Sequence, residues 1–223
     1  MKPLLKYIDP LESLPIDEQF WSTERVENLQ KCLIPTEFLG KKCLAFKVEP
    51  GDHMQKGGEE QTTERTELFE KYEQRLEFFK HVKYSFEIAL PNEFVICDNR
   101  LNFVQWKHDK SQTQPFLSFR YQNGKFDITV KNSTDGILTF AQTTELRGNW
   151  HKFEVELYLT MDMNSEIKVK IDGEIKLDYK GKASFDGELP RCRFALGPYR
   201  DAVKHIDTLF YANFERLVLD SLN

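Results

Sequence analysis

Apolar residues occupy every second position in several stretches of this chain. The alternation is clearest over residues 43–49, 84–90 and 151–159, and it returns in a longer stretch over 208–219. A period of two residues is typical of a β-strand that buries one face and turns the other to water. The pattern therefore predicts half-buried strands in these four stretches.

Short turn signals separate neighbouring strand-like stretches. Asn123-Gly124 lies between one pair of them and Asp172-Gly173 between another. Both dipeptides favour the positive backbone angles of a two-residue turn, so we expect two tight β-hairpins. With many short strands and almost no strong helical pattern, we expect an all-β fold, namely an antiparallel β-sandwich or jelly roll of the concanavalin-like kind with few short helices.

Two segments depart from the strand pattern. Residues 15–30 mix acidic, aromatic and leucine side chains, which fits either a short helix or an edge segment. In 64–79 the apolar residues recur every three or four positions, which is the period of an amphipathic helix. The pattern alone favours a helix there.

The overall composition is that of a soluble globular protein. The 223 residues are 40% hydrophobic and include 18 phenylalanines, enough for one aromatic-rich core. No linker or repeat divides the chain, so we expect a single domain over 1–223, with 1–42 completing the sandwich. The formal net charge of -5 argues against general attraction to polyanions, so an acidic ligand would need a local basic cluster. We expect no nucleic-acid or membrane partner, and a monomer.

Neither targeting segments nor cysteine spacing identifies the cellular compartment of the protein. No stretch has the apolar character of a secretion signal or the length of a membrane span. The chain is then a cytoplasmic protein, one released by another route, or a mature form. The four cysteines show no CxxC pair or zinc spacing, so we expect free buried thiols rather than a disulfide framework.

The stretch FVQWKHDK, residues 103–110, carries polar side chains along a predicted strand. Alternation puts Phe103, Gln105 and Lys107 on one face and Trp106 on the other, toward the core. A buried ammonium without a partner is costly, so this polar face needs water, a partner or a ligand. An ordinary solvated face is the simpler interpretation when the stretch is taken alone.

Two further stretches have the same character. In ERTEL, an extended backbone would put Arg65 and Glu67 on one face, where a carboxylate can hold the arginine in position. In FALGPYRD, Ala195, Gly197 and Tyr199 share a face, and a ligand could approach the backbone at Gly197. A surface ion pair and a buried tyrosine are the corresponding structural interpretations.

The order of these motifs resembles the jelly-roll polysaccharide lyases. RTEL at 65–68, QWK at 105–107, W-H-x-F-x-V at 150–155 and LGPYR at 196–200 follow one another over residues 43–219. EPGD before RTEL and the DGEIKLDYKG hairpin are also similar to that family. The nearest resemblance is to the heparin lyase I group, with alginate and glucuronan lyases as more distant relatives. It implies an extended backbone over Thr66 to Leu68, followed by a loop or short helix in FEKYEQRLEFF, residues 69–79.

The resemblance implies an enzyme that cuts an acidic polysaccharide by β-elimination. The proton beside a uronic-acid carboxylate is removed and the bond to the 4-oxygen breaks, which requires neutralisation of that carboxylate in an enolate-like transition state. Arg65 and Gln105 match the carboxylate-binding positions. Tyr199 matches the tyrosine of the family's K-x-G-x-Y motif, and Arg200 follows it as it often does in the group.

Two positions depart from the family pattern. Lys107 stands where a histidine is expected, with His108 one residue later and on the opposite face unless a bulge turns it. Ala195 stands where a lysine is expected. Tyr199 is then the best candidate for base and acid, and Lys107 becomes an alternative base if burial lowers its pKa.

The predicted site is larger than the motifs themselves. The catalytic candidates are Tyr199, Lys107 and His108. The substrate-binding candidates are Arg65, Glu67, Gln105, Arg120, Arg200 and His53. Two other hypotheses remain: a catalytically inactive carbohydrate-binding protein on the same fold, and a structural or interaction sandwich without a sugar ligand.

The resemblance requires no cofactor for the reaction. Related lyases often carry a structural calcium ion, for which an aspartate is expected in a late strand. This chain has Asn213 at that position, so the sequence supports no clear calcium site.

Overall fold

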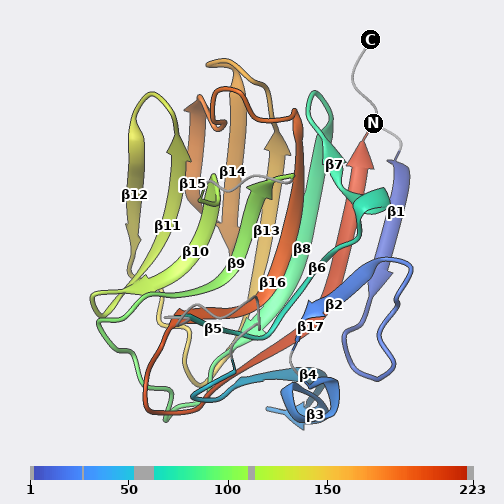
Figure 1. The fold of residues 1–223 in the computed structure, drawn as a ribbon, viewed down its shortest axis with the longest axis vertical. Helices are drawn as coiled ribbons and strands as arrows, with labels where there is room; N and C mark the ends of the chain where they lie inside the picture. The colour runs from blue at the N-terminus through green and yellow to red at the C-terminus, as the bar shows by residue number, and fades with distance from the viewer. Residues whose placement is uncertain (1–2, 27, 53–62, 110–113, 220–223) are drawn as a thin grey trace.

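The computed structural model describes residues 3–26, 28–52, 63–109 and 114–219, and they form two antiparallel β-sheets that face each other (Figure 1). Helical structure in the described residues is limited to α1 (Leu29–Cys32) and the 3-10 turn η1 (Tyr72–Gln74). The prediction of an all-β sandwich is confirmed. No helix in these ranges is long and apolar enough to cross a membrane.

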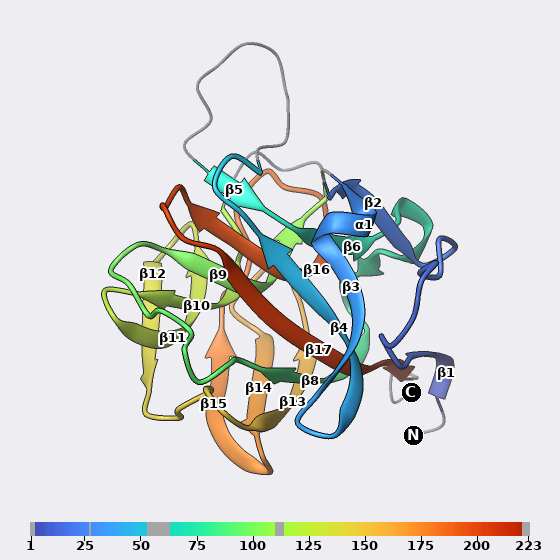
Figure 2. The same ribbon diagram turned by 90° about the horizontal axis from the view of Figure 1, so that it is seen from below.

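One sheet contains eight strands within the described ranges. Its order is β15-β14-β13-β8-β17-β4-β3, and β1 pairs with the C-terminal half of β17. Figure 2 shows β4 beside β17, with β3 on the far side of β4. Its members are β1 (Pro3–Asp9), β3 (Leu33–Phe38), β4 (Lys41–Val48), β8 (His81–Ala89), β13 (Trp150–Tyr158), β14 (Ser165–Ile171), β15 (Glu174–Gly181) and β17 (Asp207–Leu219).

The second sheet contains nine strands, again counting described residues. Its order is β12-β11-β10-β9-β16-β6-β2, and β5 and β7 pair with β16 beyond the two ends of β6. Its members are β2 (Trp21–Arg25), β5 (Thr63–Arg65), β6 (Glu67–Glu70), β7 (Leu76–Glu77), β9 (Leu101–His108), β10 (Leu117–Gln122), β11 (Lys125–Asn132), β12 (Gly136–Gln142) and β16 (Arg191–Asp201). The long strand β16 therefore holds β9 on one side and the RTEL segment on the other.

The core lies between the two sheets and consists of the apolar members of the alternating pattern. Trp106 of β9 is fully buried, and the centroid of its ring lies 4.9 Å from that of Phe194 and 5.5 Å from that of Tyr84. Each large apolar side chain buried in this way stabilises the fold by about 2 kcal/mol or more. The prediction that Trp106 anchors its strand from the core side is confirmed.

Both predicted hairpins are present. Asn123 and Gly124 have φ angles of 52° and 71°, and Asp172 and Gly173 have φ angles of 53° and 83°. Positive φ at both central residues is the signature of the tight turn that matches the twist of the flanking strands. The turn residues thus fix the pairing of β10 with β11 and of β14 with β15.

The two ambiguous segments contain more strand than helix. Within 15–30, β2 pairs with β6 at the sheet edge, and the short helix α1 begins at Leu29. The helical period of 64–79 is misleading, because β5, β6 and β7 all pair with β16 and leave only the turn η1 between β6 and β7. Pairing with a long neighbouring strand overrides a local helical period.

Irregularities in β9 and β16 change which side chains share a face. The register of β9 shifts between Asn102 and Val104 against both neighbouring strands, as a β-bulge does. Phe103 is therefore turned into the core, where its ring lies 5.5 Å from that of Phe126, centroid to centroid. The prediction that Phe103 shares a face with Gln105 is wrong, because alternation stops at the bulge.

Candidate active site

Polar side chains form rows on the face of the nine-stranded sheet that points away from the core. Strand register places Gln105 between Ala195 and Ser118, and Ser118 opposite Thr129, with the two hydroxyl oxygens 2.7 Å apart. Alternate residues of a strand lie on the same face, so the polar surface also extends along these strands in both directions from Gln105, Ser118 and Thr129. We call it the polar sheet face. Its charged members include Arg25, Arg65, Glu67, Lys107, Arg120, Asp127, Lys131 and Arg193.

Glu67 is the carboxylate around which donors from three other strands gather. One oxygen of this almost fully buried side chain accepts a hydrogen bond from the Gln105 amide. The other oxygen lies 3.4 Å from a guanidinium nitrogen of Arg25 and 3.8 Å from one of Arg65. Because these partners come from β9, β2 and β5, Glu67 fixes the relative positions of their side chains.

Tyr199 joins this group through Arg65. The two residues are directly opposite each other on β16 and β5, and the central guanidinium carbon of Arg65 lies 4.2 Å from the centroid of the tyrosine ring. The Nε atom of Arg65 is buried and has no hydrogen-bond partner among the described residues. Arg65, Gln105 and Tyr199 therefore lie together on the polar sheet face.

Lys107 lies directly opposite Arg193 on the neighbouring strand. Burial lowers the pKa of Lys107 to about 8, and the positive charges of Arg193 and Arg25 act in the same direction, while Glu67 opposes them. Burial, followed by the charge of Arg25, also lowers the pKa of Arg193, to about 10. The side chain of Lys107 can therefore lose its proton near neutral pH.

Sequence reasoning missed Arg193 and Arg25. The alternation that places Ala195 on the face of Gln105 extends two residues back to Arg193, so a signal was present in the sequence. Arg25 lies in the ambiguous segment 15–30, and only the pairing of β2 with β6 brings it next to Glu67. No local pattern indicates that long-range pairing.

Arg120 extends the polar sheet face on the β10 side of Gln105. It is paired in register with Asn102 and Asp127. Burial lowers the pKa of Arg120, and the charge of Asp127 opposes that shift. Nearby Lys131 donates a hydrogen bond to Gln114, and burial lowers its pKa to about 8. The predicted outer residue Arg120 is thus on the same face as Gln105.

His108 does not lie with the other candidates. It is fully buried on the core side of β9, with its ring centroid 5.3 Å from that of Phe78. Its Nε2 accepts a hydrogen bond from the Phe185 backbone N–H, so its Nδ1 carries the proton that is donated to the Leu189 carbonyl at 3.0 Å. Both ring nitrogens are therefore occupied, and burial lowers the pKa of His108. The assignment of His108 as a catalytic candidate is corrected to a structural role.

Arg200 is a buried ion-pair centre and not a free substrate ligand. Its side chain is 1% exposed, its Nε donates to Glu64 at 2.9 Å, and its other nitrogens donate to the Asp207 carboxylate and to the His205 carbonyl. Because its N–H donors are directed at two buried carboxylates and a backbone carbonyl, this guanidinium has none directed at a ligand. The prediction that Arg200 binds substrate is corrected for that reason.

Gly197 serves chain packing rather than approach of a ligand. Its φ angle is 124°, and a Cβ atom placed there would lie 2.2 Å from the Thr66 carbonyl oxygen and 2.9 Å from the ring of Phe46. The missing side chain thus lets the backbone of the RTEL segment pack against β16. The remaining candidate, His53, lies outside the described residues.

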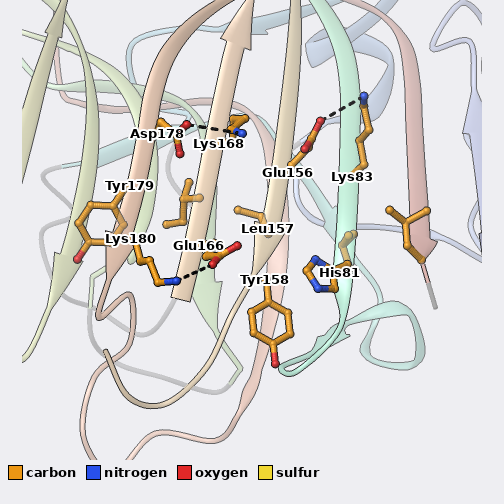
Figure 3. Close-up of a pocket in the computed structure, with 13 residues that line it drawn as sticks. His81, Lys83, Glu156, Leu157, Tyr158, Glu166, Lys168, Asp178, Tyr179 and Lys180 are labelled. Atoms are coloured by element: carbon orange, nitrogen blue, oxygen red, sulfur yellow. Dashed lines mark hydrogen bonds and ion pairs between the residues drawn. The ribbon is translucent and has the colours of Figure 1, made fainter. Parts of the chain in front are cut away.

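A separate pocket of about 290 Å³ lies on the eight-stranded sheet, on the face away from the core (Figure 3). Its charges are paired with one another. Lys168 is 3.6 Å from Asp178, Lys180 is 3.0 Å from Glu166, and Lys83 is 3.5 Å from Glu156, measured between the charged atoms. Because each lysine already has a carboxylate partner, this pocket lacks the excess positive charge of the polar sheet face.

The expected calcium position does not fit that ion. The amide of Asn213 donates to the Glu87 carboxylate at 2.7 Å, and Lys41 forms an ion pair with the same carboxylate. Calcium requires six or more free oxygen ligands. In the described part of the chain, no three histidine, cysteine, aspartate or glutamate side chains cluster as metal ligands would.

Comparison with known sequences identifies a family. A family model described as polysaccharide lyase matches residues 18–215, which is most of the chain. No curated protein matches the chain.

Solved structures share the fold at low sequence identity. An endo-β-1,4-glucuronan lyase from the fungus Trichoderma reesei is 14% identical with a TM-score of 0.66, covering 96% of this chain and 95% of that chain. A marine alginate lyase from Aplysia kurodai is 9% identical with a TM-score of 0.61, covering 98% of this chain and 100% of that chain. A structure from work on endo-acting O-glycanases of the human gut microbiota is 10% identical with a TM-score of 0.64, covering 98% of this chain and 100% of that chain.

Proposed function

The chain belongs to the polysaccharide lyase family, and on that premise we propose that it cleaves a uronic-acid-containing acidic polysaccharide by β-elimination. The observation that carries the proposal is the convergence of Arg65, Gln105 and Tyr199 on the polar sheet face. These three residues come from different strands and are connected through Glu67. An ordinary solvated face does not require such a buried arrangement of donors.

Arg65 and Gln105 neutralise the substrate carboxylate at the cleavage site. The Gln105 amide has two N–H donors, of which one is held by Glu67, so the second is available to a carboxylate oxygen. The guanidinium of Arg65, whose side chain is 15% exposed, supplies a charge-assisted donor. Donors fixed before the substrate binds stabilise the developing enolate most strongly, because they need not reorganise during the reaction.

Proton transfer involves Tyr199 together with Lys107. The free amine of Lys107, whose pKa is about 8, removes the proton from the carbon beside the carboxylate. The electron pair of that C–H bond forms the new carbon–carbon double bond as the bond to the 4-oxygen breaks. The Tyr199 hydroxyl protonates the leaving oxygen. Tyr199 acting as both base and acid is the other arrangement, and it predicts a different pH dependence.

The direct test uses the unsaturated product. The protein is incubated with a panel of uronic-acid polysaccharides, and ultraviolet absorbance of the new double bond is followed. Tyr199→Phe should abolish turnover but leave binding nearly unchanged by calorimetry, because the ring that stacks on Arg65 remains. Tyr158→Phe is the matched control, since that tyrosine stacks on His81 in the pocket of the other sheet. Retained turnover in Tyr199→Phe would remove Tyr199 from the mechanism.

The alternative is a catalytically inactive carbohydrate-binding protein. It is favoured by one observation, the replacement of the family's expected histidine and lysine by Lys107 and Ala195. In that case no polysaccharide of the panel would give an ultraviolet signal, while calorimetry would still detect binding. Loss of that binding in Gln105→Ala would place the ligand on the polar sheet face.

A further inference from the structure

Two guanidinium groups meet over one aromatic ring at the edge of the polar sheet face. The guanidinium carbon of Arg25 lies 5.1 Å from the centroid of the Phe69 ring, and that of Arg193 lies 5.4 Å from the same centroid. The three residues come from β2, β16 and β6, and β6 lies between the other two strands. Phe69 is buried but stands apart from the main core cluster between the sheets.

The positive charge at this place is only partly balanced. The charges that act most strongly on Arg193 are three arginines, Arg25, Arg75 and Arg65, and one carboxylate, Glu67. Within the described part of the chain, neither the guanidinium of Arg193 nor the ammonium of Lys107 forms a side-chain hydrogen bond or an ion pair, although the two residues are directly opposite each other. Like charges in that position destabilise a sheet. This cluster of cations therefore destabilises the folded protein, as expected at a site that is built to bind an anion.

We propose that Arg25 and Arg193 bind a second anionic group of the substrate, on the sugar next to the one whose carboxylate is held by Arg65 and Gln105. The inference rests on the proposed function, since that function supplies the first carboxylate. Arg193 is two residues from Ala195, which is the cross-strand partner of Gln105. Two residues of a strand span about 6.6 Å, which is comparable with one sugar of an extended chain.

This spacing defines a substrate class. Neighbouring sugars must both carry an anionic group, either a carboxylate or a sulfate ester, since both suit a pair of guanidinium groups. A chain in which uronic acids alternate with neutral sugars would fill the Arg65 and Gln105 position only. The competing interpretation is that the two arginines merely cover the Phe69 ring.

The test measures binding in the Tyr199→Phe background, so that no substrate is consumed. Calorimetry at low salt compares three oligosaccharide probes: contiguous uronic acids, uronic acids alternating with neutral sugars, and uronic acids alternating with sulfated sugars. Arg193→Gln should weaken binding of the contiguous probe about tenfold or more and leave the neutral alternating probe within about twofold. Arg25→Gln should weaken the contiguous probe more than the neutral alternating probe, although it changes both, because Arg25 also pairs with the Glu67 carboxylate that holds Arg65 and Gln105. The control is Lys168→Gln, which removes a cation from the pocket on the other sheet and should change neither affinity.

The sulfated probe identifies the source of the second anion. If both variants lose affinity for the sulfated probe as well as for the contiguous probe, the site accepts either a carboxylate or a sulfate ester. If the variants lose affinity for only one of these two probes, the second anion is the group that this probe carries. Equal losses for all three probes, or no loss for any, would overturn the inference. Arg193→Lys should restore part of the affinity, which a role limited to covering Phe69 does not predict.

Failure of this inference can be distinguished from failure of the proposed function. If wild-type protein releases unsaturated product but the two arginine variants bind like wild type, the second anion site is wrong and the lyase function stands. If no product forms from any polymer while the variants lose affinity for the contiguous probe, the site binds two anions without cleaving the chain.

Discussion

The pH dependence of cleavage tests whether Lys107 acts as the base. Its pKa of about 8 results from burial first and then from Arg193, Arg25 and Arg65, against the opposing charge of Glu67. With that pKa, about one amine in ten is neutral at pH 7, whereas an ordinary lysine with a pKa near 10.4 has about one in 2,500. The environment on the polar sheet face therefore raises the population of free amine by a factor of about 250.

The sign of the pH effect follows from the role of the amine. A base must be neutral, so kcat/KM should rise about tenfold per pH unit below pH 8 and level off above it. Initial rates of unsaturated-product formation between about pH 6 and pH 9.5 measure this profile. Lys107→Arg keeps the positive charge but cannot lose a proton, so it should lower the rate and remove the inflection.

A second variant tests the role of Lys107 as the base through the charge of its neighbour Arg193. Arg193→Gln removes a positive neighbour that disfavours the charged form of Lys107, so the inflection should move to higher pH. A rate that falls above pH 8 would mean that Lys107 acts as a cation toward the carboxylate. A rate that keeps rising up to about pH 9.5, with no inflection near 8, would leave Tyr199 as the base. Either result refutes the assignment of Lys107.

Two further predictions concern residues whose roles the structure changed. Arg200→Met should lower the free energy of unfolding in urea by about 3–5 kcal/mol, because it leaves Glu64 and Asp207 buried without their cation. Arg147→Met, at an exposed ion pair, should leave the free energy of unfolding nearly unchanged, and equal losses in the two variants would contradict the buried role of Arg200. Gly197→Ala should lower the midpoint of urea unfolding and slow product formation, since its Cβ would push the Thr66 carbonyl beside Arg65; unchanged values of both would contradict the packing role.

The sandwich could be predicted because its signals are local. Alternation with a period of two and the Asn-Gly and Asp-Gly turns depend on neighbouring residues only, and both hairpins formed as expected. The segment 64–79 could not be predicted from its own pattern. Its strands exist because β16 offers unpaired backbone groups beside them, and that pairing joins residues more than a hundred positions apart.

The site was predicted in part, and the errors have physical causes. Arg65, Gln105 and Tyr199 belong to motifs, and the structure brings them onto one face. Phe103 was placed on the wrong face because counting by twos fails at a bulge. Arg200 was misassigned because the sequence does not reveal which buried carboxylate will meet an arginine across a sheet.

The two departures from the family pattern are related through the charge of the polar sheet face. The lysine expected at 195 is missing, but Arg193 lies two residues earlier on the same face of the same strand and supplies a cation. That arginine stands opposite Lys107, which occupies the position of the expected histidine, and its charge helps to lower the pKa of Lys107 to about 8. Burial is the larger cause of this shift, and the cation displaced by two residues adds to it, so that Lys107 titrates in the range that a base requires near neutral pH. We infer that Lys107 and Arg193 function as a pair, so that either substitution alone should impair cleavage more than the loss of one charge would.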